Sequence, residues 1–158
     1  MTKKYNFRYE KDFSAWFRKR LEEEFGDQIV IINHTATGYG EAGISDLIIC
    51  FFGFFVIAEL KLDGKDLTAL QDRFAMRVAR AGGRLLMPVT PNPRKAPDGS
   101  EIGGADAAID YLRQIANLIQ MRRNVQTLSK EEAQYVVDET KKAMAREALE
   151  QEGGETVQ

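Results

Sequence analysis

Three charged side chains interrupt an apolar stretch between Gly43 and Lys61. They are Asp46, Glu59 and Lys61, and the sequence around them, GISDLIICFFGFFVIAELK, is rich in Phe, Val and Ile. Charge in such surroundings is costly unless it is paired or bound to a metal. Two carboxylates and an ammonium group are suited to binding a cation and handling protons, so these residues are the first candidates for chemistry.

The apolar stretch predicts a β-hairpin, because aromatic and β-branched residues favour strands and Gly53 favours a tight turn. Residues two apart in a strand share a face, so Glu59 and Lys61 point to the same side. With Phe52-Gly53 as a two-residue turn, Asp46 lies directly across from Glu59, whereas a longer loop would shift that register. Two carboxylates so close repel each other unless a cation lies between them, and their oxygens suit Mg²⁺ or Mn²⁺.

The order of these residues resembles the PD-(D/E)XK nuclease superfamily, and within it the VRR-NUC family. Ser45-Asp46 followed by Glu59-Leu60-Lys61 carries the resemblance, with Ser45 in place of the usual proline. The likeness covers roughly residues 10–116 and also includes three further elements: Gly43, Leu67-Thr68-Ala69-Leu70-Gln71 and Gly82-Gly83. It implies an α/β fold with a restriction-endonuclease-like mixed β-sheet flanked by helices.

The resemblance also implies a function, that of a metal-dependent DNA endonuclease of the small stand-alone phage or bacterial type. Asp46, Glu59 and the Leu60 carbonyl would bind Mg²⁺ or Mn²⁺, and Lys61 would hold or deprotonate the attacking water. Such proteins look like homodimers that act on branched DNA such as Holliday junctions. The alternatives are a nuclease of the same fold acting on ordinary duplex or single-stranded DNA, and a non-catalytic DNA-binding or interaction module.

Two further polar residues each allow a structural and a functional interpretation. Glu10 begins a predicted helix over residues 10–25, where the helix dipole favours an acid; the resemblance makes it an additional acid of the active site. Gln71 follows Thr68 by three residues, the spacing of a capping box at the start of a helix that runs to about Ala81. In the resembled family the equivalent glutamine reaches the metal site, and both roles can hold together.

Four residues are candidates for contact with DNA: His34, Tyr39, Lys65 and Arg73. His34 and Tyr39 belong to the Gly- and Thr-rich segment HTATGYGEAG, a predicted loop before the hairpin, although a lone histidine in a loop is also an ordinary surface residue. Lys65 falls in the predicted turn that follows the hairpin. Arg73 begins an arginine-rich outward side of the next helix, which is either a solvated face or a phosphate-binding one.

The remaining elements complete an α/β pattern with a helical extension. We expect strands over residues 28–33 and 84–90, and helices over residues 104–122 and from Ser129 to about Gln151, the latter started by a capping box. Residues 91–100 hold three of the four prolines and predict a loop. We therefore expect a nuclease domain over residues 1–122, followed by a C-terminal helical extension and frayed tail over residues 123–158.

Composition fits a soluble globular protein, with 44% hydrophobic and 29% charged residues in 158. The N-terminus has no apolar core of a signal peptide and no run is long enough to span a membrane, so we expect the cytoplasm of a bacterial or phage-infected cell. One Cys excludes an internal disulfide. Residues 1–95 carry 15 Lys/Arg against 12 Asp/Glu, and the rest 7 against 12. This asymmetry permits DNA binding without arguing for it.

Overall fold

The computed structural model describes residues 4–34, 43–62, 64–95, 99, 101–123 and 128–153. By its internal contacts the chain divides into two units, Met1–Val125 and Gln126–Gln158, and each is described by itself. Within the described residues, no helix combines the length and apolar character that a membrane span needs.

The first unit is built on a four-stranded mixed sheet. Its strands are β1 (Ile29–Asn33), β2 (Leu47–Phe51), β3 (Phe54–Leu60) and β4 (Arg84–Val89), and they lie side by side in that order. β2 pairs in antiparallel fashion with both β1 and β3, whereas β4 runs parallel to β3. The predicted mixed sheet is therefore confirmed.

The turn between β2 and β3 has the predicted length of two residues. Phe51 pairs with Phe54, and the ladder continues to Leu47 opposite Ala58. Phe52 and Gly53 both have positive φ, 48° and 78°, which is the backbone of the type I′ turn that matches the twist of a hairpin. This register makes Asp46 and Glu59 the next opposed positions beyond the last pair of the ladder.

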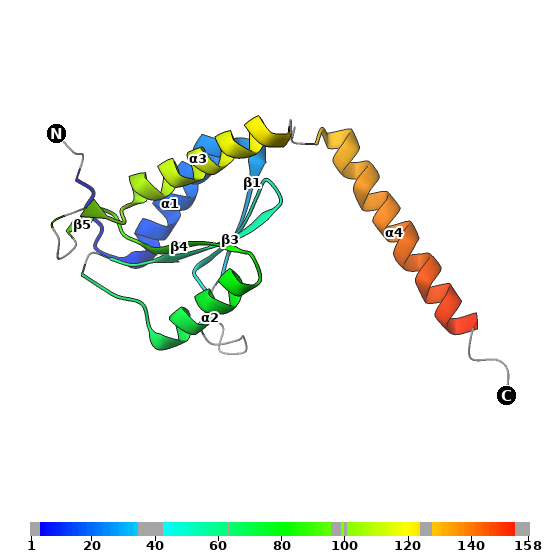
Figure 1. The fold of residues 1–158 in the computed structure, drawn as a ribbon, viewed down its shortest axis with the longest axis horizontal. Helices are drawn as coiled ribbons and strands as arrows, with labels where there is room; N and C mark the ends of the chain where they lie inside the picture. Colours follow the sequence, from blue (N-terminus) through cyan, green and yellow to red (C-terminus); the bar gives the residue numbers. More distant parts are fainter. Residues whose placement is uncertain are drawn as a thin grey trace. The chain divides into compact units, whose positions relative to one another are not determined.

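Helices cover both faces of the sheet, as predicted (Figure 1). Helices α1 (Glu10–Phe25) and α3 (Ala105–Arg123) lie on one face, and α2 (Ala69–Arg80) lies on the other. A short 3-10 turn, η1 (Gly26–Gln28), joins α1 to β1. The main core lies between the sheet, α1 and α3, and its largest fully buried side chains include Phe13, Phe17, Phe51, Leu47 and Leu112. A smaller core of Ile57, Ala75 and Val78 lies under α2.

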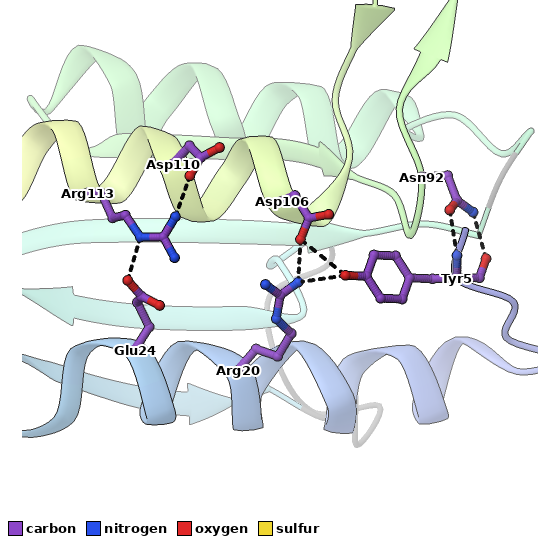
Figure 2. Close-up of polar contacts among 7 residues, drawn as sticks. All are labelled: Tyr5, Arg20, Glu24, Asn92, Asp106, Asp110 and Arg113. Carbon is purple, nitrogen blue, oxygen red and sulfur yellow. Dashed lines mark hydrogen bonds and ion pairs between the residues drawn. The ribbon is translucent and has the colours of Figure 1, made fainter. Parts of the chain in front are cut away.

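Polar contacts tie α1 to α3 along their exposed seam (Figure 2). Arg113 of α3 pairs with Glu24 of α1, and its hydrogen bond lowers the pKa of that carboxyl. One turn earlier on α1 and two turns earlier on α3, Arg20 pairs with Asp106. The N-terminal segment joins the same seam through the Tyr5 hydroxyl, which donates to Asp106 Oδ1 at 3.4 Å and accepts from Arg20 Nη1 at 3.5 Å.

The buried face of α2 differs from the predicted one. Helical spacing in the sequence predicts a buried face of Leu70, Phe74, Val78 and Ala81, but Leu70 is 48% exposed and Ala81 is exposed as well. Ala75 is buried in their place. The helix packs on β3 and β4 through Phe74, Ala75 and Val78. Leu70 lies in its first turn and Ala81 follows its last residue, so both lie beyond this packed part of the helix.

The segment predicted as a loop over residues 91–100 contains a short strand. There β5 (Arg94–Lys95) pairs in antiparallel fashion with β6 (Glu101–Ile102) to form a two-stranded ribbon. Proline and glycine punctuation correctly indicates the turns, but a pair of two-residue strands leaves no periodicity for a sequence pattern to reveal.

The second unit is the helix α4 (Lys130–Gly153). Its predicted capping box is present: the Ser129 backbone N–H donates to Glu132 Oε2 at 2.7 Å, and the Glu132 backbone N–H donates to Ser129 Oγ at 3.2 Å. Apolar side chains on its first turns, including Tyr135, Val136 and Val137, are exposed.

Candidate active site

Glu59 is the centre of the candidate site. Its side chain is fully buried near the end of β3, next to the equally buried Leu60. Lys61 Nζ donates to Glu59 Oε1 at 2.6 Å, and Gln71 Nε2 donates to the same oxygen. The other oxygen, Oε2, is buried and has no hydrogen-bond partner among the described atoms. A carboxylate oxygen in that position is suited to accept a further ligand.

Asp46 approaches from the start of β2. Its Oδ2 accepts a hydrogen bond of 2.8 Å from the backbone N–H of Leu60, so the carboxylate is held across the strand from Glu59, as the hairpin register predicts. Gly43 holds the segment before it: φ is +87°, and a Cβ added here would lie 2.6 Å from the carbonyl oxygen of Leu70. Only glycine allows this close approach to α2 with a positive φ.

Gln71 joins the start of α2 to the site. The Thr68 side chain accepts from the backbone N–H of Gln71 at 3.3 Å, and Gln71 Oε1 accepts from the backbone N–H of Thr68 at 2.8 Å. This capping box occupies the amide oxygen, so the amide NH₂ group faces Glu59. The two interpretations of Gln71 are thus met by one side chain at the same time: it caps the helix and it donates to the candidate catalytic acid.

Burial governs the protonation of the two acids. Desolvation raises the pKa of Glu59 from 4.5 to about 7, against the opposing hydrogen bond from Lys61. Desolvation also raises the pKa of Asp46, although the Leu60 N–H and the charge of Lys61 act in the opposite direction. For Lys61 burial lowers the pKa, but the bond to Glu59 and the nearby carboxylates outweigh it and raise the pKa overall. Lys61 is therefore an ammonium group at neutral pH.

These residues fit a divalent cation. Burial disfavours the charged forms of Asp46 and Glu59, and the charge of Asp46 further disfavours the charged form of Glu59. Glu59 Oε2 has no protein partner among the described atoms. Carboxylate and carbonyl oxygens are the ligands that Mg²⁺ and Mn²⁺ prefer. Among the described residues, no group of three or more His, Cys, Asp or Glu side chains could hold a metal. The candidate donors are therefore the two carboxylates and the Leu60 carbonyl that the sequence led us to expect.

Glu10 lies beside the site without joining the two acids in a single cluster. It begins α1 and lines a pocket together with Asp46, and its charge raises the pKa of Asp46. Glu10 Oε2 is 3.9 Å from Lys65 Nζ, so this lysine pairs with the acid. The position is compatible with both expected roles, a first-turn acid and an acid next to the active site.

The other candidates for DNA contact lie at different distances from these acids. His34 is close, because its backbone N–H donates to the Asp46 carbonyl at 2.8 Å, and it lines the same pocket as Glu10. Arg73 is exposed on α2, two residues after Gln71. Tyr39 lies outside the described residues.

Sequence reasoning missed several polar residues near Asp46. Lys11, Ser14 and Arg18 of α1 and Asn33 of β1 line the pocket that Glu10, His34 and Asp46 share. The spacing of three and four residues along α1 was the available signal, since it places these polar side chains on one stripe beside the buried one. Ser45 was also unexpected as a fully buried polar residue.

Comparisons with known proteins complete this description. No family model matches the chain, and no curated protein does. Among solved structures the chain is similar to one described as "VRR_NUC domain", with 16% sequence identity, 63% of this chain and 92% of that chain covered, and a TM-score of 0.42.

Proposed function

We propose that this protein is a metal-dependent DNA endonuclease that hydrolyses phosphodiester bonds. The observation that carries the proposal is the gathering of Asp46, Lys61 and Gln71 around the buried carboxylate of Glu59, at the end of two paired strands. The sequence motifs that resemble the VRR-NUC family contain the same four residues. A site of this composition on rigid strands is suited to phosphoryl chemistry.

The residues divide the work by their chemistry. Asp46, Glu59 and the Leu60 carbonyl would hold Mg²⁺ or Mn²⁺, which when bound would neutralise charge on the phosphate and make water more acidic. Gln71 positions the Glu59 carboxylate, because its amide is fixed by the capping box and donates to Oε1. Glu59 Oε2 has no hydrogen-bond partner among the described atoms, which leaves it available to bind the cation.

Lys61 acts as a cation in this proposal. Its raised pKa keeps it protonated, so it cannot accept a proton from water without first losing its own. The ammonium group has three donors, of which one reaches Glu59 at 2.6 Å. The others would hold the attacking water or offset the negative charge that develops on the phosphate oxygens. Of the two roles expected from sequence, water holding is favoured over deprotonation.

Branched DNA such as a Holliday junction is the substrate we propose, cleaved by a homodimer that brings two sites to two strands. Exposed apolar side chains support self-association: Val30 is 61% exposed and Ile32 58% on the sheet, and Tyr135 is 67% exposed on α4. Exposed apolar patches of this kind favour protein contacts. A molar mass from light scattering that corresponds only to the monomer would contradict the proposed homodimer.

The test is a cleavage panel of plasmid, flap and four-way-junction DNA with Mg²⁺, Mn²⁺ or EDTA. We expect cleavage with either metal, none in EDTA, and the fastest rate on the junction. Asp46→Ala should abolish cleavage while its unfolding midpoint shows that it is still folded. Equal cleavage by this variant would reject the site. Faster cleavage of linear or single-stranded DNA would retain the nuclease and reject the branched substrate.

A further inference from the structure

A pocket with a volume of about 220 Å³ lies next to the candidate active site. It is formed between α1 and the strand ends that carry the site. Asp46 and Leu60 belong to both the site and the pocket. The other lining residues come from α1 and from the end of β1: Glu10, Lys11, Ser14, Ala15, Arg18, Asn33 and His34.

Arg18 is the residue that most needs a ligand. Its Nε atom is buried and has no acceptor among the described atoms. Among the described residues, the ion pair of this guanidinium group is a long one, 3.7 Å from Nη2 to Glu22 Oε1 on the next turn. A buried N–H donor without an acceptor is unfavourable, and a charged acceptor is the strongest remedy. The pocket side of Arg18 therefore favours an anion.

The two acids that line the pocket, Glu10 and Asp46, do not accept hydrogen bonds from Arg18. Glu10 pairs with Lys65 at 3.9 Å, and Asp46 accepts from the Leu60 backbone N–H. Lys11 adds a second positive charge to the pocket, seven residues before Arg18 on α1. The pocket thus has an acidic side shared with the active site and a basic side on α1. A ligand that spans the pocket would place a group bound by the cation at the acidic side and an anionic group at the basic side.

We propose that this pocket binds the phosphate next to the scissile phosphodiester, with Arg18 and Lys11 as charged donors and Ser14 and His34 as further hydrogen-bond donors. The proposal rests on the proposed function, because it takes the scissile phosphate to lie at Asp46 and Glu59. Contacts to phosphate fix the position of a strand without reading its sequence. The pocket would therefore set the direction in which the strand crosses the site.

The test uses DNA strands in which one phosphate at a time is replaced by an uncharged methylphosphonate. Cleavage at each bond is resolved on a denaturing gel. In the natural protein, neutralising the phosphate on one side of a bond should slow cleavage of that bond about tenfold, the effect of losing one charge-assisted contact. Arg18→Gln should cleave unmodified DNA about tenfold more slowly and should lose this dependence on the neighbouring phosphate.

The matched control is Lys19→Gln. Lys19 does not line the pocket. Its side chain is 75% exposed and pairs with Glu23 on the following turn. Its removal should leave both the rate and the phosphate dependence unchanged. Arg18→Lys should retain part of the dependence, because it keeps the charge. Dependence that persists in Arg18→Gln, or that is absent in the natural protein, would overturn the proposal.

Two additional experiments complete the test. The first distinguishes an internal phosphate from one at a strand end, and the second tests the pocket separately from the proposed nuclease activity. Strands that begin at the neighbouring position, with a 5′-phosphate or a 5′-hydroxyl, show whether the pocket binds an internal phosphate or a strand end. Titration of the Arg18 Nε–H resonance with inorganic phosphate does not depend on cleavage. A saturable shift that Asp46→Ala retains would support the pocket even if no DNA were cleaved, whereas no shift would count against it even in an active nuclease.

Discussion

The pH dependence of folding should report the burial of Glu59. Desolvation raises the pKa of this carboxyl from 4.5 to about 7, so the folded state binds the proton more tightly than the unfolded chain does. The stability contributed by that proton is complete below the unfolded pKa and is lost as the pH rises through the folded one. A shift of this size corresponds to about 3 kcal/mol, at about 1.4 kcal/mol for each pKa unit.

The assay compares the natural protein with Glu59→Gln by urea unfolding in EDTA at pH 5 and at pH 8. A glutamine cannot titrate in this range, but its oxygen can still accept from Lys61 and Gln71. We expect the free energy of unfolding of the natural protein to fall from pH 5 to pH 8 by about 3 kcal/mol more than that of the variant. The raised pKa of Asp46 acts in the same direction, and its effect is present in both proteins.

Equal pH dependence in the two proteins would refute this reasoning, because it would mean that Glu59 titrates alike in the folded and unfolded states. A fall that appears only in the variant would also contradict it. If the pH dependence is as expected, adding Mg²⁺ at pH 8 should restore stability to the natural protein and not to Glu59→Gln, since ligand binding to the folded state stabilises it.

Three further predictions concern the elements that position the site. Gly43→Ala should destabilise the protein by at least about 1 kcal/mol in urea unfolding, because the position has φ +87° and no room for a Cβ. Thr68→Ala and Ser129→Ala each remove a capping box and should each cost about 1 kcal/mol, but only Thr68→Ala should also slow DNA cleavage, because only that box holds Gln71. Phe17→Ala should cost about 3–5 kcal/mol by calorimetry, because the ring is fully buried in the main core.

Much of the site could be predicted because its geometry is local. The turn at Phe52-Gly53 fixes the register of the hairpin, and the register alone brings Asp46 opposite Glu59. The capping box was predicted from a spacing of three residues, and both of its hydrogen bonds are present. Such features depend on neighbouring residues and on the period of a strand or helix, which sequence patterns describe well.

Features that depend on long-range packing could not be predicted in the same way. The exposure of Leu70 follows from its place in the first turn of α2, before the residues that pack on β3 and β4, which no spacing within the helix reveals. The pocket beside Asp46 combines residues of α1 with the end of β1, and Arg18 alone gave no sign of it in the sequence. The buried Ser45 likewise depends on how the segment before β2 packs against the rest of the fold.

The most direct measurement is the rate at which Glu59→Gln cleaves DNA with Mg²⁺ when enzyme is in excess over substrate. Glutamine keeps the shape of the side chain and an oxygen for Lys61 and Gln71, but it removes the charge that a cation and the reaction require. If Glu59 is the central acid of a metal-dependent nuclease, the rate should fall by at least about 100-fold relative to the natural protein. A rate within about twofold of the natural protein would contradict that account, because removing one central ligand cannot leave metal-dependent hydrolysis unchanged.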